Sequence, residues 1–389
     1  MTQEVPIGSL VEAVATRDPS RVGDPEFVYV DLSAVDQDMK EIRGPRTIAR
    51  SDAPSRARQV IHRGDVLMST VRPNLNGVAH VPEALSGAIA STGFTVLRPG
   101  PKLDSRYLFH WVRTHRFVAD MVKNATGASY PAISDTIVRE SLVPLLPLEE
   151  QRRIAAILDR ADALRTKRRE AIAHLDTLTQ SIFLQMFGDP VENPRGLPIR
   201  ALDAWVDPDR PVTYGILKPG PEIPNGVPYV RVAEMRDGGI ALPGVRRTSP
   251  EIARQYRRST LRAGDLLISI RGHVGRMADV PVVLDGANIT QDSARLAIDP
   301  RSVEYVRATL QSTRLQAWMA RRTKGAAVQG LNLGDLRLAP LPVPPLREQE
   351  EFGRLARGMR RNGEIARRQL VDCEALAASL CDRAFKGEL

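Results

Sequence analysis

Two stretches far apart in this chain begin alike: LPLEEQRRIAAILDRADALRTKRREAI from Leu146 and PPLREQEEFGRLARGMRRNGEIARRQL from Pro344. Each has a proline at its start, followed within a few positions by acidic residues and a glutamine. Proline suits the first turn of a helix, and acidic side chains near that end are stabilised by the positive pole of the helix dipole. The two stretches therefore predict two long helices, 147–187 and 345–389, the second including a C-terminal tail.

The parts of the chain before these helices also repeat one another. FVYVDLSAVD from Phe27 aligns with VPYVRVAEMR from Val227, and IHRGDVLMSTVR from Ile61 aligns with LRAGDLLISIRG from Leu261, both with an offset of 200 residues. Further on the offset is 198, where GASYPAISDTIVRESLVPLLPLEEQ from Gly127 aligns with GAAVQGLNLGDLRLAPLPVPPLREQ. The chain is thus a duplicated unit in the order globular part, helix, globular part, helix.

Each globular part mixes two kinds of pattern. DVLMSTV after Gly64 and DLLISI after Gly264 are short apolar runs bounded by turn residues, which predict strands. DSRYLFHWVRTHRFVADMVKN and its counterpart SVEYVRATLQSTRLQAWMARR carry apolar residues at helical spacing. We therefore expect α+β domains at 1–146 and 199–344, with a linker at 188–198 that holds three prolines and two glycines.

An apolar stripe at heptad spacing follows each predicted helix. Such a stripe usually packs against the helix's own domain. Here each stripe lasts about 33 residues, roughly 50 Å, which is longer than one globular part needs to cover. We therefore predict that the helices pack on each other as an antiparallel, pseudo-twofold coiled coil with a globular part at each end, although Arg168, Asn362 and Gln369 interrupt the stripes. The predicted seam is formed by Ile154, Ile157, Ala161, Leu164, Leu175, Leu178, Ile182, Phe352, Leu355, Met359, Leu376 and Leu380.

Composition narrows the class of protein. The 389 residues carry a formal net charge of +9, and because the two helical stretches are nearly balanced, the excess belongs to the globular parts. A basic surface favours nucleic acid but is not specific for it. The only cysteines, Cys373 and Cys381, are few enough for a reducing compartment and have no zinc-site spacing. With no apolar run near the roughly 18 residues of a membrane span, we expect a cytoplasmic protein.

Taken together, these motifs resemble those of the specificity (S) subunit of type I restriction-modification systems. The resemblance covers essentially the whole chain and includes PLEEQRRIAAILDRADAL, QMFGDPVENPRGLP, GVPYVRVAEM, RAGDLLISIRG and the terminal AFKGEL. It implies that each globular part is a target recognition domain for one half of a split sequence in double-stranded DNA. It further implies that the helices set the half-site spacing and dock two modification (M) subunits, which bind S-adenosylmethionine and methylate adenine. Whether restriction (R) subunits complete the complex stays open.

The residues themselves show no catalytic motif. No GxxxxGK[ST] loop and no Asn-Pro-Pro-aromatic motif is present, and the histidines stand at no metal or triad spacing. Asp65 and Asp265 each follow a glycine and are most simply turn residues. We therefore nominate no catalytic residue, no metal site and no cofactor bound by this chain.

Two groups of loops are candidate DNA contacts. VRPNLNG and RGHVGR follow the GDVLMST and GDLLISI strands and offer cationic, amide or imidazole groups to base edges. VKNATGASYPAIS and RRTKGAAVQGLN contain a glycine that allows close approach to phosphate or base. The alternative is that both are ordinary solvated loops, as we expect for the basic runs at Arg246–Arg247 and Arg257–Arg258. The predicted DNA-binding residues are Arg72, Asn74, Asn76, Lys123, Ser129, Tyr130, Arg271, His273, Arg276, Lys324, Gln329 and Asn332.

Two other functions stay open on the sequence alone. One is a stand-alone methyltransferase or nuclease with a degenerate site, which methyl transfer or cleavage by the purified chain would establish. The other is a coiled-coil, sequence-specific DNA-binding regulator without modification partners. Tight, salt-resistant, specific binding by the lone chain would favour the regulator.

Overall fold

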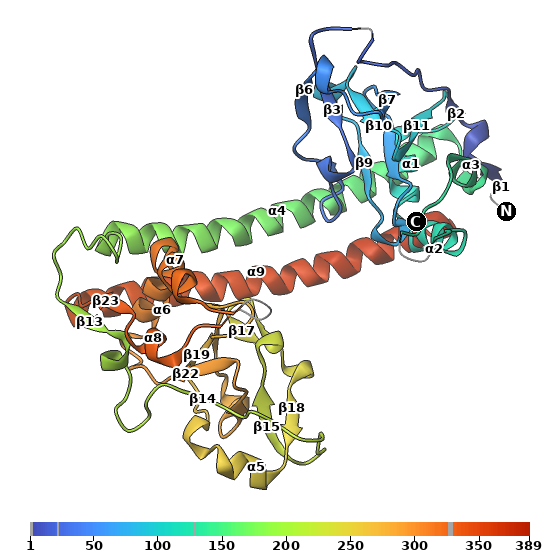
Figure 1. The fold of residues 1–389 in the computed structure, drawn as a ribbon. Helices are drawn as coiled ribbons and strands as arrows, with labels where there is room; N and C mark the ends of the chain where they lie inside the picture. Colours follow the sequence, from blue (N-terminus) through green and yellow to red (C-terminus); the bar gives the residue numbers. More distant parts are fainter. Residues whose placement is uncertain (1–2, 22, 128–129, 326–329) are drawn as a thin grey trace. The chain divides into compact units, whose positions relative to one another are not determined.

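The computed structural model describes residues 3–21, 23–127, 130–325 and 330–389. The chain divides into two compact units, one made of Met1–Glu170 and Arg367–Leu389 and the other of Ala171–Ala366. Each unit contains a mixed α/β globular part and one portion of each of the two long helices, α4 (Leu148–Phe187) and α9 (Leu346–Lys386) (Figure 1). The α+β content and the long helices predicted from the sequence are therefore present.

The first unit contains two four-stranded sheets, with strand orders β6-β3-β10-β7 and β2-β11-β8-β9. A two-stranded sheet β1-β12 and a small hairpin β4-β5 complete the strand content of its described residues. The bounds are β1 Gln3–Pro6, β2 Val11–Glu12, β3 Glu26–Val30, β4 Val35–Asp36, β5 Glu41–Ile42, β6 Arg46–Ala49, β7 Ala57–Val60, β8 Val66–Ser69, β9 Val78–His80, β10 Ile89–Ser91, β11 Phe94–Pro99 and β12 Leu142–Leu145, with helices α1 Ser105–Trp111, α2 His115–Lys123 and α3 Asp135–Glu140.

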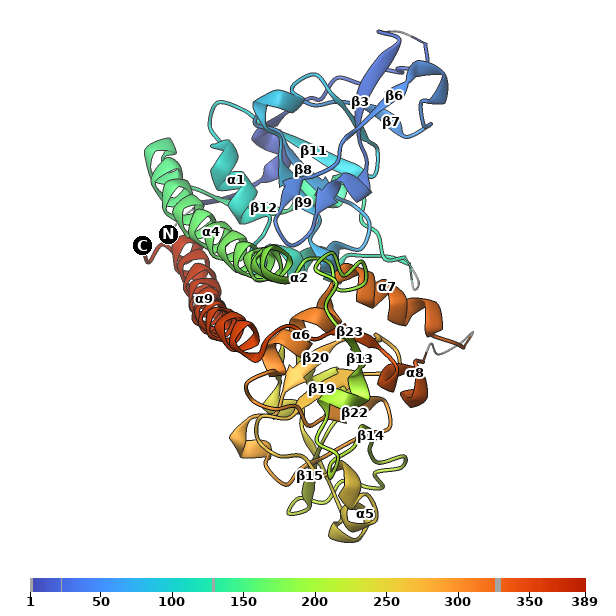
Figure 2. The same ribbon diagram turned by 90° about the vertical axis from the view of Figure 1, so that its left-hand side faces the viewer.

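The second unit repeats this arrangement. Its sheets are β14-β22-β19-β20, β18-β15-β21, β13-β23 and the hairpin β16-β17, and α6 lies between the β19-β20-β22 sheet and α9 (Figure 2). The bounds are β13 Ile199–Ala201, β14 Thr213–Tyr214, β15 Val227–Val230, β16 Met235–Arg236, β17 Gly239–Ile240, β18 Arg246–Thr248, β19 Leu266–Ser269, β20 Met277–Asp279, β21 Asn288–Ile289, β22 Ser293–Leu296 and β23 Pro340–Pro342, with helices α5 Pro250–Gln255, α6 Val303–Gln311, α7 Thr313–Arg322 and α8 Leu333–Arg337.

Strands β8 and β19 lie where the DVLMSTV and DLLISI runs predict them. The helical segment that begins at Asp104, by contrast, is divided into α1 and α2. The break follows from Thr114, whose hydroxyl accepts a hydrogen bond from the Phe117 N–H and starts a new helix. α6 and α7 are divided in the same way at Ser312, which caps α7.

Side chains at equivalent positions make equivalent bonds in the two units. The Tyr107 hydroxyl donates to the Pro144 carbonyl oxygen at 2.9 Å, and the Tyr305 hydroxyl donates to that of Pro342 at 2.8 Å. Gln151, completely buried at the start of α4, donates to the Leu146 carbonyl oxygen at 2.8 Å. At the start of α9, Gln349 and Pro344 form the same bond at the same distance. All four pairs obey the offset of 198 residues, so the repeat extends to individual hydrogen bonds.

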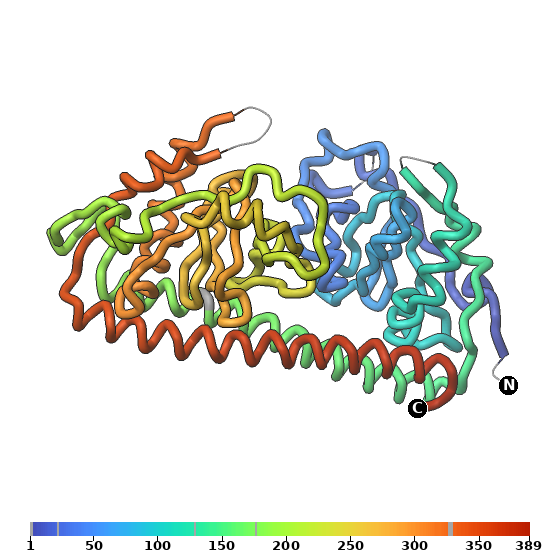
Figure 3. Tube along the Cα trace, turned by 90° about the horizontal axis from the view of Figure 1, so that it is seen from below, coloured from blue at the N-terminus to red at the C-terminus, as the bar shows by residue number. Residues whose placement is uncertain are grey.

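Within each unit the portions of α4 and α9 lie side by side (Figures 1 and 3). In the first unit Arg169 of α4 forms an ion pair with Glu374 of α9 at 2.7 Å. In the second, Thr179 contacts Met359 at 3.6 Å, and the rings of Phe183 and Phe352 are 5.6 Å apart. Because the number on α9 falls as the number on α4 rises, the two helices run antiparallel at these contacts.

The predicted seam is wrong for four leucines. Leu164, Leu178, Leu355 and Leu376 are 52, 47, 46 and 54% exposed, so they are not part of the buried stripe. The other predicted seam residues are buried or half-buried. The difference arises because the start and the end of each helix also pack on a globular part, and these contacts turn a different face inward. Residues of that face outside the predicted set are Ala155, Leu158, Phe183, Phe187, Ala356, Gly363, Ala366 and Ala384.

Among the described residues, no helix combines the length and apolar character needed to cross a membrane. No cluster of three or more His, Cys, Asp or Glu side chains in these ranges is placed to hold a metal ion.

Candidate nucleic-acid interface

In the first unit, two loop segments that the sequence singles out separately lie against each other. Thr126 and Ala132 pair across a narrow hairpin, and Ala132 also pairs with Val71 in the loop that follows β8. The Arg72 N–H donates to the Pro131 carbonyl oxygen at 2.7 Å. Arg72 and Tyr130, predicted as contacts from two separate segments, therefore lie together.

The exposed side chains at this place include a cation and an aromatic ring in contact. The Arg72 guanidinium lies over the Tyr130 ring, 4.8 Å from its centre, and Tyr130 is 69% exposed. Asn74 is also exposed, whereas Asn76 is partly buried and its carbonyl oxygen accepts a hydrogen bond from Lys40 Nζ at 2.5 Å. Arg72, Asn74 and Tyr130 are thus available to a ligand, and Asn76 has a structural bond through its backbone.

The second unit joins the equivalent segments in the same way. Lys324 pairs with Gly330 across the second hairpin, and Gly330 pairs with Arg271 in the loop that follows β19. The Leu331 N–H donates to the Ile270 carbonyl oxygen at 2.8 Å. One scaffold thus carries different side chains in its two copies, as expected of loops that bind different targets.

Several predicted contacts in this unit have bonds within the chain. The Arg276 guanidinium donates to the Met235 carbonyl oxygen at 3.2 Å, and the Asn332 side chain caps α8. Arg271 and His273 are exposed, with the Arg271 guanidinium 4.0 Å from a carboxylate oxygen of Asp292. Lys123 and Lys324 are exposed, and Ser129 and Gln329 lie outside the described residues. All twelve stay predicted DNA contacts.

Asp65 and Asp265 are turn residues, as the sequence favours, because they accept hydrogen bonds from the N–H groups of His62 and Arg262 at 2.8 and 2.7 Å. Each also has a buried ion pair that the sequence did not predict. Asp65, 1% exposed, accepts from the Arg98 guanidinium at 2.7 and 2.9 Å. Asp265, 4% exposed, accepts from Arg210 at 2.6 and 2.8 Å. The two partners come from different segments, which explains why comparing the repeats did not reveal them. In the basic run Arg246–Arg247, the Arg247 guanidinium donates a hydrogen bond to the Gly226 carbonyl oxygen at 2.9 Å.

Charged side chains fasten α4 to the first globular part, a role that sequence patterns did not predict. Asp159 accepts from Arg106 at 3.0 Å and bonds to the His110 ring at 2.7 Å, and Asp162 accepts from Arg113 at 2.6 Å. Burial alone would raise the pKa of Asp159, but the bonds from His110 and Arg106 outweigh it and hold that pKa well below its usual range. Burial lowers the pKa of His110.

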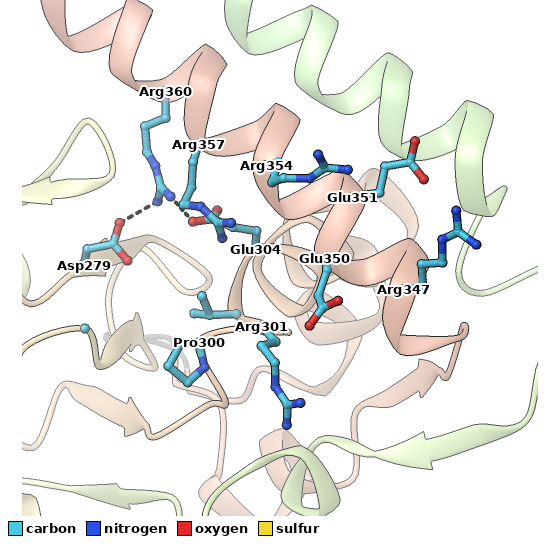
Figure 4. Close-up of a pocket in the computed structure, with 12 residues that line it drawn as sticks. Asp279, Pro300, Arg301, Glu304, Arg347, Glu350, Glu351, Arg354, Arg357 and Arg360 are labelled. Carbon is cyan, nitrogen blue, oxygen red and sulfur yellow. Dashed lines mark hydrogen bonds and ion pairs between the residues drawn. The ribbon is translucent and has the colours of Figure 1, made fainter.

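In the second unit the charges at this contact are inverted. Arg360 of α9 forms ion pairs with Asp279 of β20, at 2.5 Å, and with Glu304 of α6 (Figure 4). The buried Arg307 pairs with the same two carboxylates. Glu304 occupies the position equivalent to Arg106, and Arg360 the position equivalent to Asp162. The sign of the charge is thus reversed at both positions, but the pairs differ, because Arg106 pairs with Asp159 and Asp162 pairs with Arg113 in the first unit. No shared sequence motif therefore marks this contact.

A charged cavity of about 820 Å³ lies beside the start of α9 (Figure 4). In the part of the chain that the structure describes, five of its lining side chains form no ion pair: Glu350, Glu351, Arg347, Arg354 and Arg357. Both signs of charge are present, so the cavity does not have the purely cationic character of a phosphate-binding site. A cavity lined by charges of both signs is better suited to binding the surface of a partner protein than to binding phosphate.

Known proteins resemble this chain in sequence. The family model "Type I restriction modification DNA specificity domain" matches residues 57–174. The specificity subunit of the type I restriction enzyme EcoBI of Escherichia coli is 27% identical over 319 residues, covering 74% of this chain and 66% of that subunit. The chain thus spans just under two thirds of the length of that relative.

Solved structures agree in fold. A chain from a study of complex assembly and conformational transition in the type I R-M system matches with a TM-score of 0.58 and 28% identity, covering 100% of this chain and 98% of its own. The S subunit from M. genitalium matches with the same TM-score at 14% identity, covering 98% of this chain and 96% of its own. In its repeated units, in sequence and in fold, the chain thus resembles type I restriction-modification specificity (S) subunits.

Proposed function

We propose that this chain is the DNA sequence-specificity subunit of a type I restriction-modification complex and reads a bipartite target, one half-site with each unit. The observation that carries the proposal is the repeated loop cluster. In both units the loop after an equivalent strand pairs with an equivalent hairpin, at Val71 with Ala132 and at Arg271 with Gly330. The scaffold is the same but the exposed side chains differ, which suits two readers of two different sequences.

We further propose that 1–146 and 199–344 act as tandem target recognition domains, joined through the linker 188–198. Helices 147–187 and 345–389 would pack as an antiparallel coiled coil between them and fix the half-site spacing. The antiparallel contacts inside each unit support this proposal, as do the ring contacts of Phe187 with Tyr305 and of Phe385 with Tyr107. Each globular part thereby receives the start of its own helix and the end of the other.

The chain would be non-catalytic and would bind no cofactor. Two M subunits would bind S-adenosylmethionine and methylate adenine in the double-stranded DNA target, and R subunits would add cleavage. The complex would act in the cytoplasm, where the DNA is. This assignment draws on the family and leaves the chain with two tasks, recognition and assembly.

The exposed leucines suggest where the M subunits dock. Leu178 and Leu376 occupy equivalent positions of the two helices and are 47 and 54% exposed. Two equivalent apolar positions suit two copies of one partner, since the burial of each leucine would contribute about 1 kcal/mol or more. In the second unit Leu355, 46% exposed, follows Arg354 of the charged cavity, so apolar and charged groups adjoin as they do in protein interfaces.

Methylation mapping tests the function. The chain is co-expressed with M subunits from the same genome, and methylated adenines are mapped with and without this gene. We expect methylation at a bipartite sequence only when the chain is present. Methylation that persists without the chain, or failure to co-purify with any methyltransferase, would contradict the proposal.

Docking is tested separately by Leu178→Glu and Leu376→Glu. Each should reduce the amount of M subunit that co-purifies, and together they should abolish it. Ala375→Glu is the matched control, because Ala375 is exposed on α9 next to Leu376 but points from another side of the helix. Equal retention of M by the double variant and the control would rule out docking at these leucines.

A further inference from the structure

Arg72 has an unusual backbone conformation. Its φ and ψ are 51° and 62°, in the left-handed region that residues other than glycine seldom adopt. In the second unit the equivalent position, at the offset of 200 residues, is Gly272 with φ 71°. Equivalent bonds support this match, because Ile133 donates to Thr70 at 2.9 Å where Leu331 donates to Ile270 at 2.8 Å. The first unit thus keeps an arginine where the second uses the residue that fits without strain.

Four residues later, the same loop again has a left-handed residue other than glycine where the second unit has a glycine. Asn76 has φ 46°, and the other left-handed residue of the second loop is Gly275, with φ 90°. Between the two strained residues of the first unit lies a short 3-10 turn whose Pro73 is buried. Residues held in strained conformations gather at functional sites, where the surrounding structure fixes them. The strain therefore directs attention to the side chain that Arg72 presents.

That side chain is oriented but has no polar partner. The Tyr130 ring covers one face of the guanidinium at 4.8 Å, and the Arg72 N–H is bonded to Pro131 of the same hairpin. In the part of the chain that the structure describes, the guanidinium forms no hydrogen bond and no ion pair. Its N–H donors, which lie in one plane, are therefore free to bind a ligand from the edge.

We propose that Arg72, held flat by Tyr130, reads a guanine in the half-site bound by the first unit; this inference rests on the proposed function. A guanine presents two acceptors, O6 and N7, in one plane at the major-groove edge, and a guanidinium meets them with two parallel hydrogen bonds. A planar donor pair needs its plane fixed to make that contact. The ring of Tyr130 and the backbone of Arg72 together supply this constraint.

A phosphate is the competing ligand for the same donors. Phosphate oxygens can be approached from many directions, and a flexible cation serves them well. Neither a strained backbone nor a ring under the guanidinium is needed for that contact. The second unit supports the distinction, because its Gly272 offers no side chain at this position and its Arg271 lies near the Asp292 carboxylate instead of an aromatic ring.

The test uses the complex reconstituted with its M subunits. Initial methylation rates are measured on duplexes in which each base pair of the target is exchanged in turn. For the wild type, one G·C pair in one half-site should show a rate loss of roughly 5- to 150-fold on exchange, the range expected for one bidentate contact. Arg72→Gly should fold, because glycine adopts φ 51° freely, and should reduce that discrimination to nearly one-fold. At every other base pair of the target, the ratio of the two methylation rates before and after exchange should stay at its wild-type value.

Two variants of the ring complete the design. Tyr130→Phe keeps the stacking face and should keep the discrimination, whereas Tyr130→Ala should lower it. If Arg72→Gly slows all duplexes equally and leaves every ratio unchanged, Arg72 contacts phosphate and the guanine proposal is overturned. If the wild-type complex methylates without any sequence preference, the proposed function itself fails, and the inference fails with it.

Discussion

Phe187 provides a sharp test of how the end of α4 is anchored in the second unit. Its side chain is 4% exposed, and its ring lies 4.9 Å from Tyr305, 5.3 Å from Phe183 and 5.7 Å from Phe352. Phe187→Ala removes the ring from this cluster and leaves a cavity that three aromatic neighbours cannot fill. Substitutions of this kind cost about 3–5 kcal/mol. The free energy of unfolding of the second unit should fall by that amount.

Urea denaturation, followed by amide hydrogen exchange along the chain, measures this loss. Exchange should accelerate most at the start of α9, where Phe352 lies, and at α6, where Tyr305 lies. The control is Leu184→Ala on the same helix, which is 46% exposed and should cost less than about 1 kcal/mol. If the two variants lose the same stability, or if α9 exchanges at its wild-type rate in Phe187→Ala, the contact does not anchor the helices.

Three further predictions concern charge, acid and length. Asp65→Asn leaves Arg98 without its buried charged partner and should lower the free energy of unfolding, measured in urea titrations, by about 3 kcal/mol. A loss below about 1 kcal/mol would show that the ion pair does not stabilise the fold. Burial, together with the nearby Arg106, lowers the pKa of His80 to about 4, below its value near 6.5 in the unfolded state. Between these two pH values the unfolded state binds more protons than the folded state. The free energy of unfolding should therefore fall as the pH falls from about 6.5 to 4. His80→Gln should flatten that part of the stability profile, and an unchanged slope would exclude the histidine as its source. Deleting seven residues from the middle of each long helix shortens it by about 10 Å and should change the half-site spacing in a methylation map or abolish methylation; an unaltered spacer would refute the coiled coil as the ruler.

The duplication was readable from the sequence because its signals are local. The repeated motifs lie in short stretches that align without a gap. Examples are Gly64-Asp65 with Gly264-Asp265 and the starts of the two long helices. The structure extends this agreement to the hydrogen bonds of Tyr107 and Tyr305. The α+β content and the long helices followed from the same local patterns.

The register of the helices was less predictable. Heptad counting favours the large leucines, and it placed Leu164 and Leu355 in the seam, but the structure exposes both. Small residues such as Ala356 and Gly363 are buried instead. A helix that packs on a globular part and on another helix has a wide buried face, and sequence spacing alone does not say which edge of that face stays open.

The loop cluster shows a similar limit. The sequence nominated Arg72 and Tyr130 separately, as members of two different loops. Their contact depends on pairing between Val71 and Ala132, which are distant in the chain. The left-handed backbone of Arg72 has no sequence signal either, because arginine seldom adopts it. The comparison with Gly272 in the second copy becomes informative only once the conformations are known.

The central claim is that two separate units of one chain each read one half of a divided DNA target. The most direct measurement is a methylation map of the complete complex carrying Arg72→Gly or Arg271→Ala. We predict that the wild type methylates a target of two half-sites separated by unspecified bases, and that each variant relaxes a different half-site while the other stays readable. A contiguous target, or equal loss at both halves in each variant, would contradict the account.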